Sequence, residues 1–263
     1  MPRIGFVCPV YRALEFDSYT RRSLESFFDT TPGGVAIVVD DHSPDWTPEY
    51  ARSLESLAVN RPGAEIHLLR FDTSGGLTRS WNAGLTQAQT LGLDYAIAGN
   101  NDIVFTLRWQ DEMLSALDRG YALVGPLSNA PGTQPLQEVQ RYCTNYQLTD
   151  HAEVLDQTAA ELYRNHRGRV LEQKINGFFQ MAAMATWEAG KYDAIHYYCP
   201  SNPFTSRGLR NPTPLMTLNE DELQARWHRS GKRSAIVLSS FIFHYRAVSR
   251  GESYKRGNWY RQS

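Results

Sequence analysis

The chain has 263 residues, 41% of them hydrophobic and 12% aromatic, so it can bury a large core as one big domain or two small ones. Its 27 basic and 28 acidic residues give a net charge of −1, which excludes an overall field that would recruit nucleic acid or an anionic membrane. No stretch approaches the roughly 20 apolar residues that span a bilayer, and the apolar run after Met1 is too short for a signal peptide, so we expect a soluble, cytoplasmic protein without stable membrane insertion.

Strands and helices alternate along the first hundred residues. In chain order the pattern predicts a strand at residues 4–10, a helix after Asp17, a strand at 35–39, a helix from about Pro48, a strand at 64–69, a helix at 78–91, and strands at 93–99 and 103–105. Apolar and β-branched runs mark the strands, whereas apolar residues at helical spacing mark the helices. This order is typical of an α/β fold with a mostly parallel central sheet flanked by helices.

Polar clusters follow three of the predicted strands, at Asp40-Asp41, Gly75-Gly76 and Asn100-Asn101-Asp102. Ligands of such sheets usually bind beyond the carboxyl ends of the strands, so we expect these clusters to meet at one edge. Paired carboxylates there can bind ribose hydroxyls or a base edge, and the glycines let backbone amides approach an anion. A helix cap, a turn and a flexible loop are the alternative interpretations.

The triplet Asn100-Asn101-Asp102 interrupts an apolar run, and it has two interpretations. Asn and Asp form turns readily, so a turn is the simpler one. The other is a divalent cation, because oxygen ligands at a strand end suit Mg²⁺ or Mn²⁺ and leave room for substrate phosphates. The neighbouring motifs must decide between them.

The second half contains three further features. Residues 150–169 form an amphipathic helical stretch that either covers a substrate or mediates a homo-oligomer, and residues 197–214 form an irregular loop suited to substrate specificity. A helix with an acidic first turn is predicted from Asn219 as its N-cap, with Glu222 at the third helical position. Buried strand at residues 235–238 and 241–243 then leads directly into His244.

The motif series resembles the nucleotide-sugar half of family 2 glycosyltransferases with the GT-A fold. The matching segments are residues 6–12, 38–43, 75–84 and 100–102, in that order. Residues 176–181 and 218–223 resemble the acceptor-side motifs of that family, the latter its "ED" element. The resemblance implies a single GT-A domain over residues 1–263, with a nucleotide-sugar-binding half at 1–105, an acceptor-binding half at 106–245 and a basic tail at 246–263 as a lid.

The resemblance also implies a donor site. Pro9, Tyr11 and Asp41 would hold the nucleoside, with Asp40 supporting the loop or the ribose. Arg246 or Arg250 would contact phosphate. The remaining donor-site residues are Arg12, Gly76, Arg79, Asn100 and Asn101.

A metal site follows from the same resemblance. Asp102 would be the ligand of the family's "DxD" motif, holding Mn²⁺ or Mg²⁺ against the diphosphate. Asn100 stands at the first position of that motif, which removes one negative charge. His244 would be a further ligand, although a histidine beside a buried strand is more often a satisfied core residue.

The implied reaction is inverting transfer of a sugar from a nucleotide sugar, with UDP-sugars favoured, to an acceptor hydroxyl. Asp221 would be the general base and Glu220 the reserve candidate, although the helix dipole alone also favours acids in this first turn. The acceptor would be a glycan, lipid-linked saccharide, protein hydroxyl or modified base. The alternatives are a nucleotidyltransferase acting on sugar phosphates and a noncatalytic sugar-binding relative.

Overall fold

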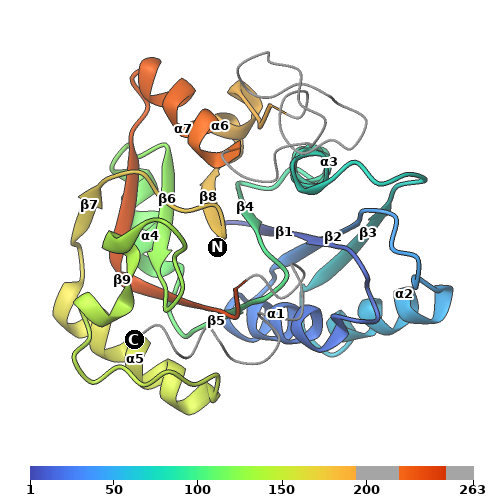
Figure 1. Cartoon of the computed structure of the whole chain (residues 1–263), viewed down its shortest axis with the longest axis horizontal. Helices are drawn as coiled ribbons and strands as arrows, with labels where there is room; N and C mark the ends of the chain where they lie inside the picture. Colours follow the sequence, from blue (N-terminus) through green and yellow to red (C-terminus); the bar gives the residue numbers. More distant parts are fainter. Residues whose placement is uncertain (194–218, 247–263) are drawn as a thin grey trace.

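The computed structural model describes residues 1–193 and 219–246, which form an α/β fold around a nine-stranded sheet (Figure 1). The strands are β1 Ile4–Val10, β2 Val35–Asp40, β3 Glu65–Arg70, β4 Tyr95–Gly99, β5 Ile103–Phe105, β6 Leu123–Leu127, β7 Val170–Glu172, β8 Phe179–Ala183 and β9 Ser234–His244. The α-helices are α1 Asp17–Thr30, α2 Pro48–Glu55, α3 Leu77–Thr90, α4 Asp111–Asp118, α5 Ala152–His166, α6 Met184–Ala189 and α7 Asn219–Arg229.

The sheet order is β3-β2-β1-β4-β8-β6-β9-β5, and β7 pairs with β9. Strands β3, β2, β1 and β4 are parallel neighbours, so their carboxyl ends lie at one edge as expected. The second half is mixed, because β8 runs antiparallel to both β4 and β6. The last strand, β9, is parallel to β6 and antiparallel to β5, and its register places Ile103 opposite His244.

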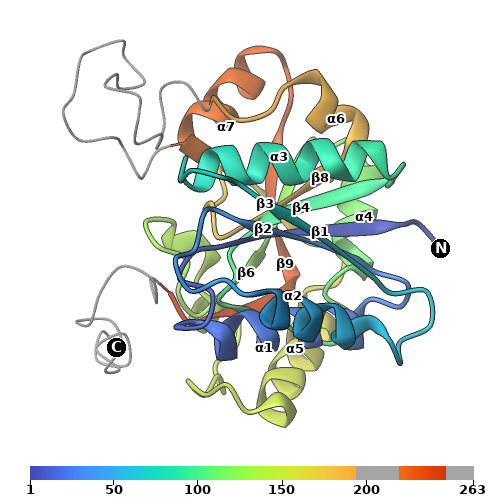
Figure 2. The same cartoon turned by 90° about the vertical axis from the view of Figure 1, so that its right-hand side faces the viewer.

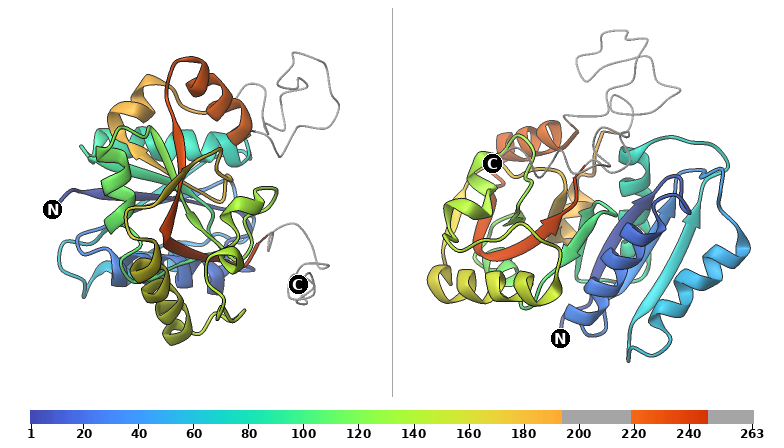
Figure 3. Two further views of the ribbon diagram at one scale, coloured as in Figure 1. Left: turned by 90° about the vertical axis from the view of Figure 1, so that its left-hand side faces the viewer. Right: turned by 60° about the horizontal axis from the view of Figure 1, so that its bottom comes forward.

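Helices cover both faces of the sheet (Figure 2). Helices α3, α6 and α7 lie on one face, and α1, α2 and α5 lie on the other. Figure 3 shows β9 curving past α5, far from it in sequence. Helix α3 packs closely against β1 at Gly84, because a Cβ there would lie 2.2 Å from Cγ1 of Val7.

The predicted elements of the first half are confirmed within one or two residues at most ends, and the predicted fold class is confirmed. The two predicted runs at 235–238 and 241–243 form one continuous strand, β9. Helix α7 includes Asn219 as its first residue, and the Asn219 amide donates to Oγ1 of Thr78 over 3.2 Å. Glu222 pairs with Arg226 along the helix (2.9 Å). Strands β6, β7 and β8 and helices α4 and α6 were not predicted.

None of the helices in the described part of the chain is long and apolar enough to cross a membrane.

Candidate active site

The two nucleotide-side motifs at the carboxyl edge are joined by the backbone. The N–H of Asp41 donates to the carbonyl of Val10 over 2.9 Å, which ties the end of β2 to the end of β1. On the other side of β1, the N–H of Asn100 donates to the carbonyl of Phe178 over 3.0 Å. The predicted clusters at Asp40-Asp41 and Asn100-Asn101-Asp102 therefore lie along one edge of the sheet, on either side of the end of β1.

Asp102 and His244 form a buried pair at this edge. Their side chains are 8% and 6% exposed, and His244 Nε2 lies 3.3 Å from Asp102 Oδ1. The amide nitrogen of Asn100 is also 3.3 Å from the same ring nitrogen. Asp102 and Asn100 thus both approach His244 Nε2. The antiparallel pairing of β5 with β9 places His244 next to them.

The other ring nitrogen fixes the tautomer of His244. Nδ1 lies 3.0 Å from the carbonyl oxygen of Ala130, and because a carbonyl can only accept, Nδ1 carries the hydrogen. In the neutral ring Nε2 therefore presents a lone pair to the Asp102 carboxylate. The Asn100 amide can donate to this lone pair, but the lone pair and the carboxylate repel each other, and a proton or a metal cation between them would remove that repulsion. Stacking against Phe178, at 5.0 Å between ring centroids, holds the plane of the imidazole.

This pair fits a divalent cation that is completed by substrate. Within residues 1–193 and 219–246, no group of three or more His, Cys, Asp or Glu side chains could hold a metal ion. The protein would supply the Asp102 oxygen and His244 nitrogen, and rotation of the Asn100 amide would add an oxygen. A site with so few protein ligands is typical of ions that bind one or two carboxylates plus substrate phosphates.

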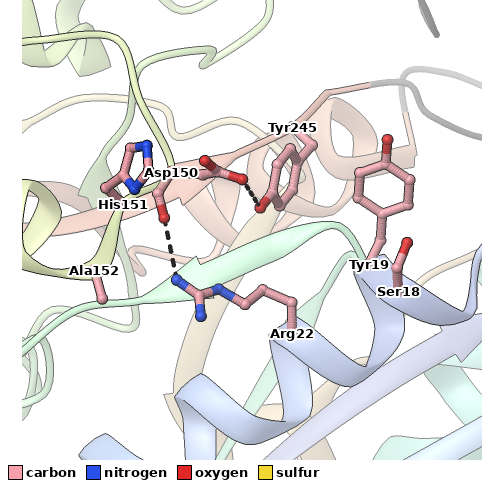
Figure 4. Close-up of a pocket in the computed structure, with 7 residues that line it drawn as sticks. All are labelled: Ser18, Tyr19, Arg22, Asp150, His151, Ala152 and Tyr245. Carbon is pink, nitrogen blue, oxygen red and sulfur yellow. Dashed lines mark hydrogen bonds between the residues drawn. The ribbon is translucent and has the colours of Figure 1, made fainter.

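Tyr245 anchors the chain directly after His244 (Figure 4). Its N–H donates to the carbonyl of Asp102 over 2.9 Å, and its hydroxyl donates to Oδ2 of Asp150 over 2.6 Å. Arg22 donates to the Asp150 carbonyl over 3.1 Å, and the ring of Tyr19 packs edge-on against Tyr245. These residues line an open groove of about 610 Å³. Burial and the Asp150 carboxylate raise the pKa of Tyr245, so its hydroxyl remains a donor.

Asp41 organises the loop before α3. Its carboxylate accepts from Ser74 Oγ (2.7 Å), from the amides of Gly75 and Gly76 (both 2.8 Å) and from Arg79 Nη2 (3.1 Å). The glycine amides, which we expected to face a bound anion, thus bind a carboxylate of the chain itself. All four acceptor positions of Asp41 are filled, so Asp41 shapes the donor side through this loop.

Arg79 is held in place by the same loop. Besides Asp41 it binds the carbonyl of Thr73, and its guanidinium lies 3.7 Å from the ring centroid of Phe71. Gly75 is required for this packing, because a Cβ there would lie 2.0 Å from Nε of Arg79. Gly76 has φ of +84°, which glycine adopts without strain.

Asp40 is fully buried below this loop. It accepts from the Ser43 amide over 3.1 Å and pairs with Arg70 over 3.3 Å. Burial raises the pKa of Asp40, and the hydrogen bonds from Ser43 and the charge of Arg70 offset this only in part. Asp40 therefore supports the turn after β2 through its contacts with Ser43 and Arg70.

The other predicted donor-side residues are dispersed. Pro9 is buried within β1, whereas Tyr11 is 44% exposed beside it, with the Arg12 guanidinium 5.8 Å from its ring centroid. Asn101 turns away from His244, because its amide donates to Oγ1 of Thr20 on α1 over 3.0 Å. Arg246, with φ of +61°, is the last described residue of this segment. Arg250 lies outside the described residues, as do the predicted loop at 197–214 and most of the basic tail.

The acceptor-side motifs meet next to the metal-side pair. A Cβ on Gly177 would lie 2.9 Å from the carboxyl carbon of Glu220, so Glu220 sits directly against Gly177. The next residue, Phe178, stacks on His244. Burial and the charge of Glu220 raise the pKa of Tyr192, which places that phenol near the same carboxylate. Glu220 is therefore linked to His244 through the consecutive residues Gly177 and Phe178.

Asp221, the predicted base, lies in the first turn of α7 with its side chain 33% exposed. Its Oδ1 lies 2.5 Å from Nζ of Lys174. We had not singled out Lys174, and no feature of the sequence distinguishes it from other lysines. The contact of Ala130 with His244 was also missed, since a backbone carbonyl carries no sequence pattern. Phe178 belonged to a predicted motif, but its stacking on His244 depends on the pairing of β8 with β4.

The parallel strands of the first half, the mixed second half and the helices on both faces of the sheet agree with the GT-A fold that the sequence resemblance implied. The chain belongs to the family "Glycosyl transferase family 2", whose model matches residues 6–186. No protein of curated function matches it by sequence.

Three solved structures show the same fold. GalNAc-T7 with UDP, GalNAc and Mn²⁺ is 13% identical with a TM-score of 0.62, over 93% of this chain and 44% of that one. The mannosyltransferase PcManGT of Pyrobaculum calidifontis, with GDP-Man and Mn²⁺, is 14% identical with a TM-score of 0.57, over 92% and 56%. TarS 1-349 of S. aureus with UDP-GlcNAc is 12% identical with a TM-score of 0.55, over 97% and 61%. The chain thus spans between 44% and 61% of their lengths.

Proposed function

We propose that the protein is a metal-dependent, inverting glycosyltransferase that moves a sugar from a nucleotide sugar to an acceptor hydroxyl. The observation that carries this proposal is the buried Asp102–His244 pair at the carboxyl edge of the sheet. Family membership and similarity to structures that contain UDP, GDP-Man or UDP-GlcNAc support it. We favour a UDP-sugar as the donor, with residues 1–105 as the donor half and 106–245 as the acceptor half.

Asp102, His244 and Asn100 are the residues that would hold the ion, and the ring nitrogen favours a first-row transition ion such as Mn²⁺ over Mg²⁺. When bound, such an ion supplies positive charge to the diphosphate as negative charge grows on it. The chain's own contribution is to keep the His244 ring in one tautomer and one plane. The Ala130 carbonyl fixes the tautomer by accepting a hydrogen bond from Nδ1, and the stacked ring of Phe178 fixes the plane.

On the acceptor side, Asp221 would take the hydroxyl proton. The acceptor oxygen then forms a bond to the anomeric carbon while the bond from that carbon to the diphosphate breaks, and the electron pair leaves with the nucleoside diphosphate. One base and no covalent nucleophile are needed, which gives inversion. Glu220 packs against Gly177, and the next residue, Phe178, stacks on His244. From this position Glu220 would contact the donor sugar or serve as the base in place of Asp221.

The test measures release of nucleoside diphosphate from a panel of nucleotide sugars, with and without Mn²⁺. We expect turnover with one or a few nucleotide sugars, and loss of about 100-fold or more in Asp221→Asn and in Asp102→Ala. Asp72→Asn is the matched control, because Asp72 is exposed near the donor side. Unchanged release in both site variants would contradict the proposal. Thermal stabilisation by nucleoside triphosphates but by no nucleotide sugar would favour a nucleotidyltransferase.

A further inference from the structure

The proposed base is bound by a cation from another segment of the chain. Lys174 Nζ lies 2.5 Å from Asp221 Oδ1, and the two side chains are 44% and 33% exposed. An ion pair that is this open to water contributes only about 0–1 kcal/mol to stability. A substrate that reaches the site can therefore displace either partner from the other.

The position of Lys174 is set by a frame of neutral side chains. Gln134 donates to the carbonyl of Lys174 over 2.6 Å. Gln224 of α7 accepts from the amide of Ile175 and donates to its carbonyl, both over 2.8 Å. Because Gln224 and Asp221 lie on the same helix, the segment that carries Lys174 is fixed relative to the base. These backbone hydrogen bonds therefore hold Lys174 where its ammonium group contacts Asp221.

The neighbouring acid behaves differently. Glu222 pairs with Arg226 one turn further along α7, at 2.9 and 3.2 Å, which is an ordinary stabilising pair within a helix. Asp221 receives its cation from outside the helix. An intrahelical role in stability therefore does not account for Lys174.

In this pair Lys174 Nζ lies 2.5 Å from Asp221 Oδ1, and so occupies a position that a hydroxyl must reach to give its proton to that oxygen. Transfer at full rate requires that Lys174 leave Asp221, and an anionic group on the acceptor gives it another partner. We propose that Lys174 determines acceptor specificity, by binding a carboxylate or phosphate group that lies next to the reacting hydroxyl. This inference rests on the proposed function, and it assigns the acceptor to a chemical class, the acidic saccharides and phosphorylated compounds. The proton of the hydroxyl passes to Asp221 once the anion has taken Lys174.

The experiment compares acceptors of one skeleton that differ in charge. Release of nucleoside diphosphate is measured with water alone, glucose, glucuronate and glucose 6-phosphate, at constant ionic strength and with saturating Mn²⁺. We expect at least a tenfold preference of the wild type for the anionic acceptors in kcat/KM, as for one charge-assisted contact. Lys174→Gln should abolish this preference and raise release with water severalfold, because the base is then unmasked. Lys174→Arg should keep the preference.

Arg233→Gln is the control, since Arg233 forms a comparably exposed ion pair with Glu172 at 3.2 Å. The inference is wrong if the wild type treats neutral and anionic acceptors alike, or if Lys174→Gln retains the preference. Either result would leave the proposed function standing. Absence of nucleoside diphosphate release from every nucleotide sugar by the wild type would instead overturn the proposed function itself.

Discussion

His244 Nε2 faces Oδ1 of Asp102 at 3.3 Å, while Nδ1 of the same ring is bonded to a backbone carbonyl. The two side chains lie far apart in the sequence and meet because β5 pairs with β9. A ring whose second nitrogen is fixed by a carbonyl is a common arrangement for metal-ligating histidines. The relationship makes the metal interpretation of the triplet directly testable.

Replacement of His244 by Gln should lower the affinity for Mn²⁺ by at least tenfold, because the ring nitrogen is lost from a site with few protein ligands. Free Mn²⁺ is measured by electron paramagnetic resonance during titration, in the presence of nucleoside diphosphate, so the readout does not depend on activity. His151→Gln serves as the control, since His151 is exposed. Equal affinity in His244→Gln and wild type would remove His244 from the metal site.

Replacement of Tyr245 by Phe should lower the free energy of unfolding by about 1.5–3 kcal/mol, the range for a hydrogen bond to a charged group. The lost contact is the 2.6 Å bond to Asp150 (Figure 4). Urea unfolding measures the change. A second expectation is weaker Mn²⁺ binding, because the chain after His244 loses its anchor. If stability fell while Mn²⁺ affinity stayed the same, Tyr245 would have a purely structural role.

Replacement of Asp41 by Ala should destabilise the protein by about 2–4 kcal/mol, because four donors lose one carboxylate. Arg79 also loses its anionic partner, so nucleotide binding should weaken with it. Urea unfolding and titration with nucleoside diphosphate measure the two effects. Asp72→Asn should change neither. A stable variant that no longer binds nucleotide would instead indicate direct contact between Asp41 and the nucleoside.

The raised pKa of Asp40 predicts a pH dependence of stability. In the folded state the carboxyl holds its proton above the ordinary value of 3.8, so the folded state binds more protons than the unfolded state in this range. Stability from this group is therefore present at low pH and lost as pH rises through the folded pKa. Asp40→Asn removes this loss while retaining an acceptor for Ser43. Its melting temperature relative to wild type should rise between pH 4 and neutral pH, and a constant difference would contradict the raised pKa.

Local patterns predicted the elements of the first half because each strand there is a short apolar run and each helix has its own apolar face. The run at residues 35–39 and the helix at 78–91 appear as β2 and α3 with nearly these bounds. Strands β6 and β8 escaped prediction. They are short, and β6 contains a glycine and a proline, so only their long-range pairing identifies them.

For the site, the sequence determined which residue types follow the strands, and thereby that Asp40, Asp41 and Asp102 would lie at one edge. Only the tertiary structure decided what each carboxylate faces. Asp41 binds the glycine loop, Asp102 faces His244, and Asp221 pairs with Lys174. The physical reason is that hydrophobic periodicity encodes each strand and helix locally. These partners are brought together by pairing and packing between segments far apart in the chain, which no local pattern records.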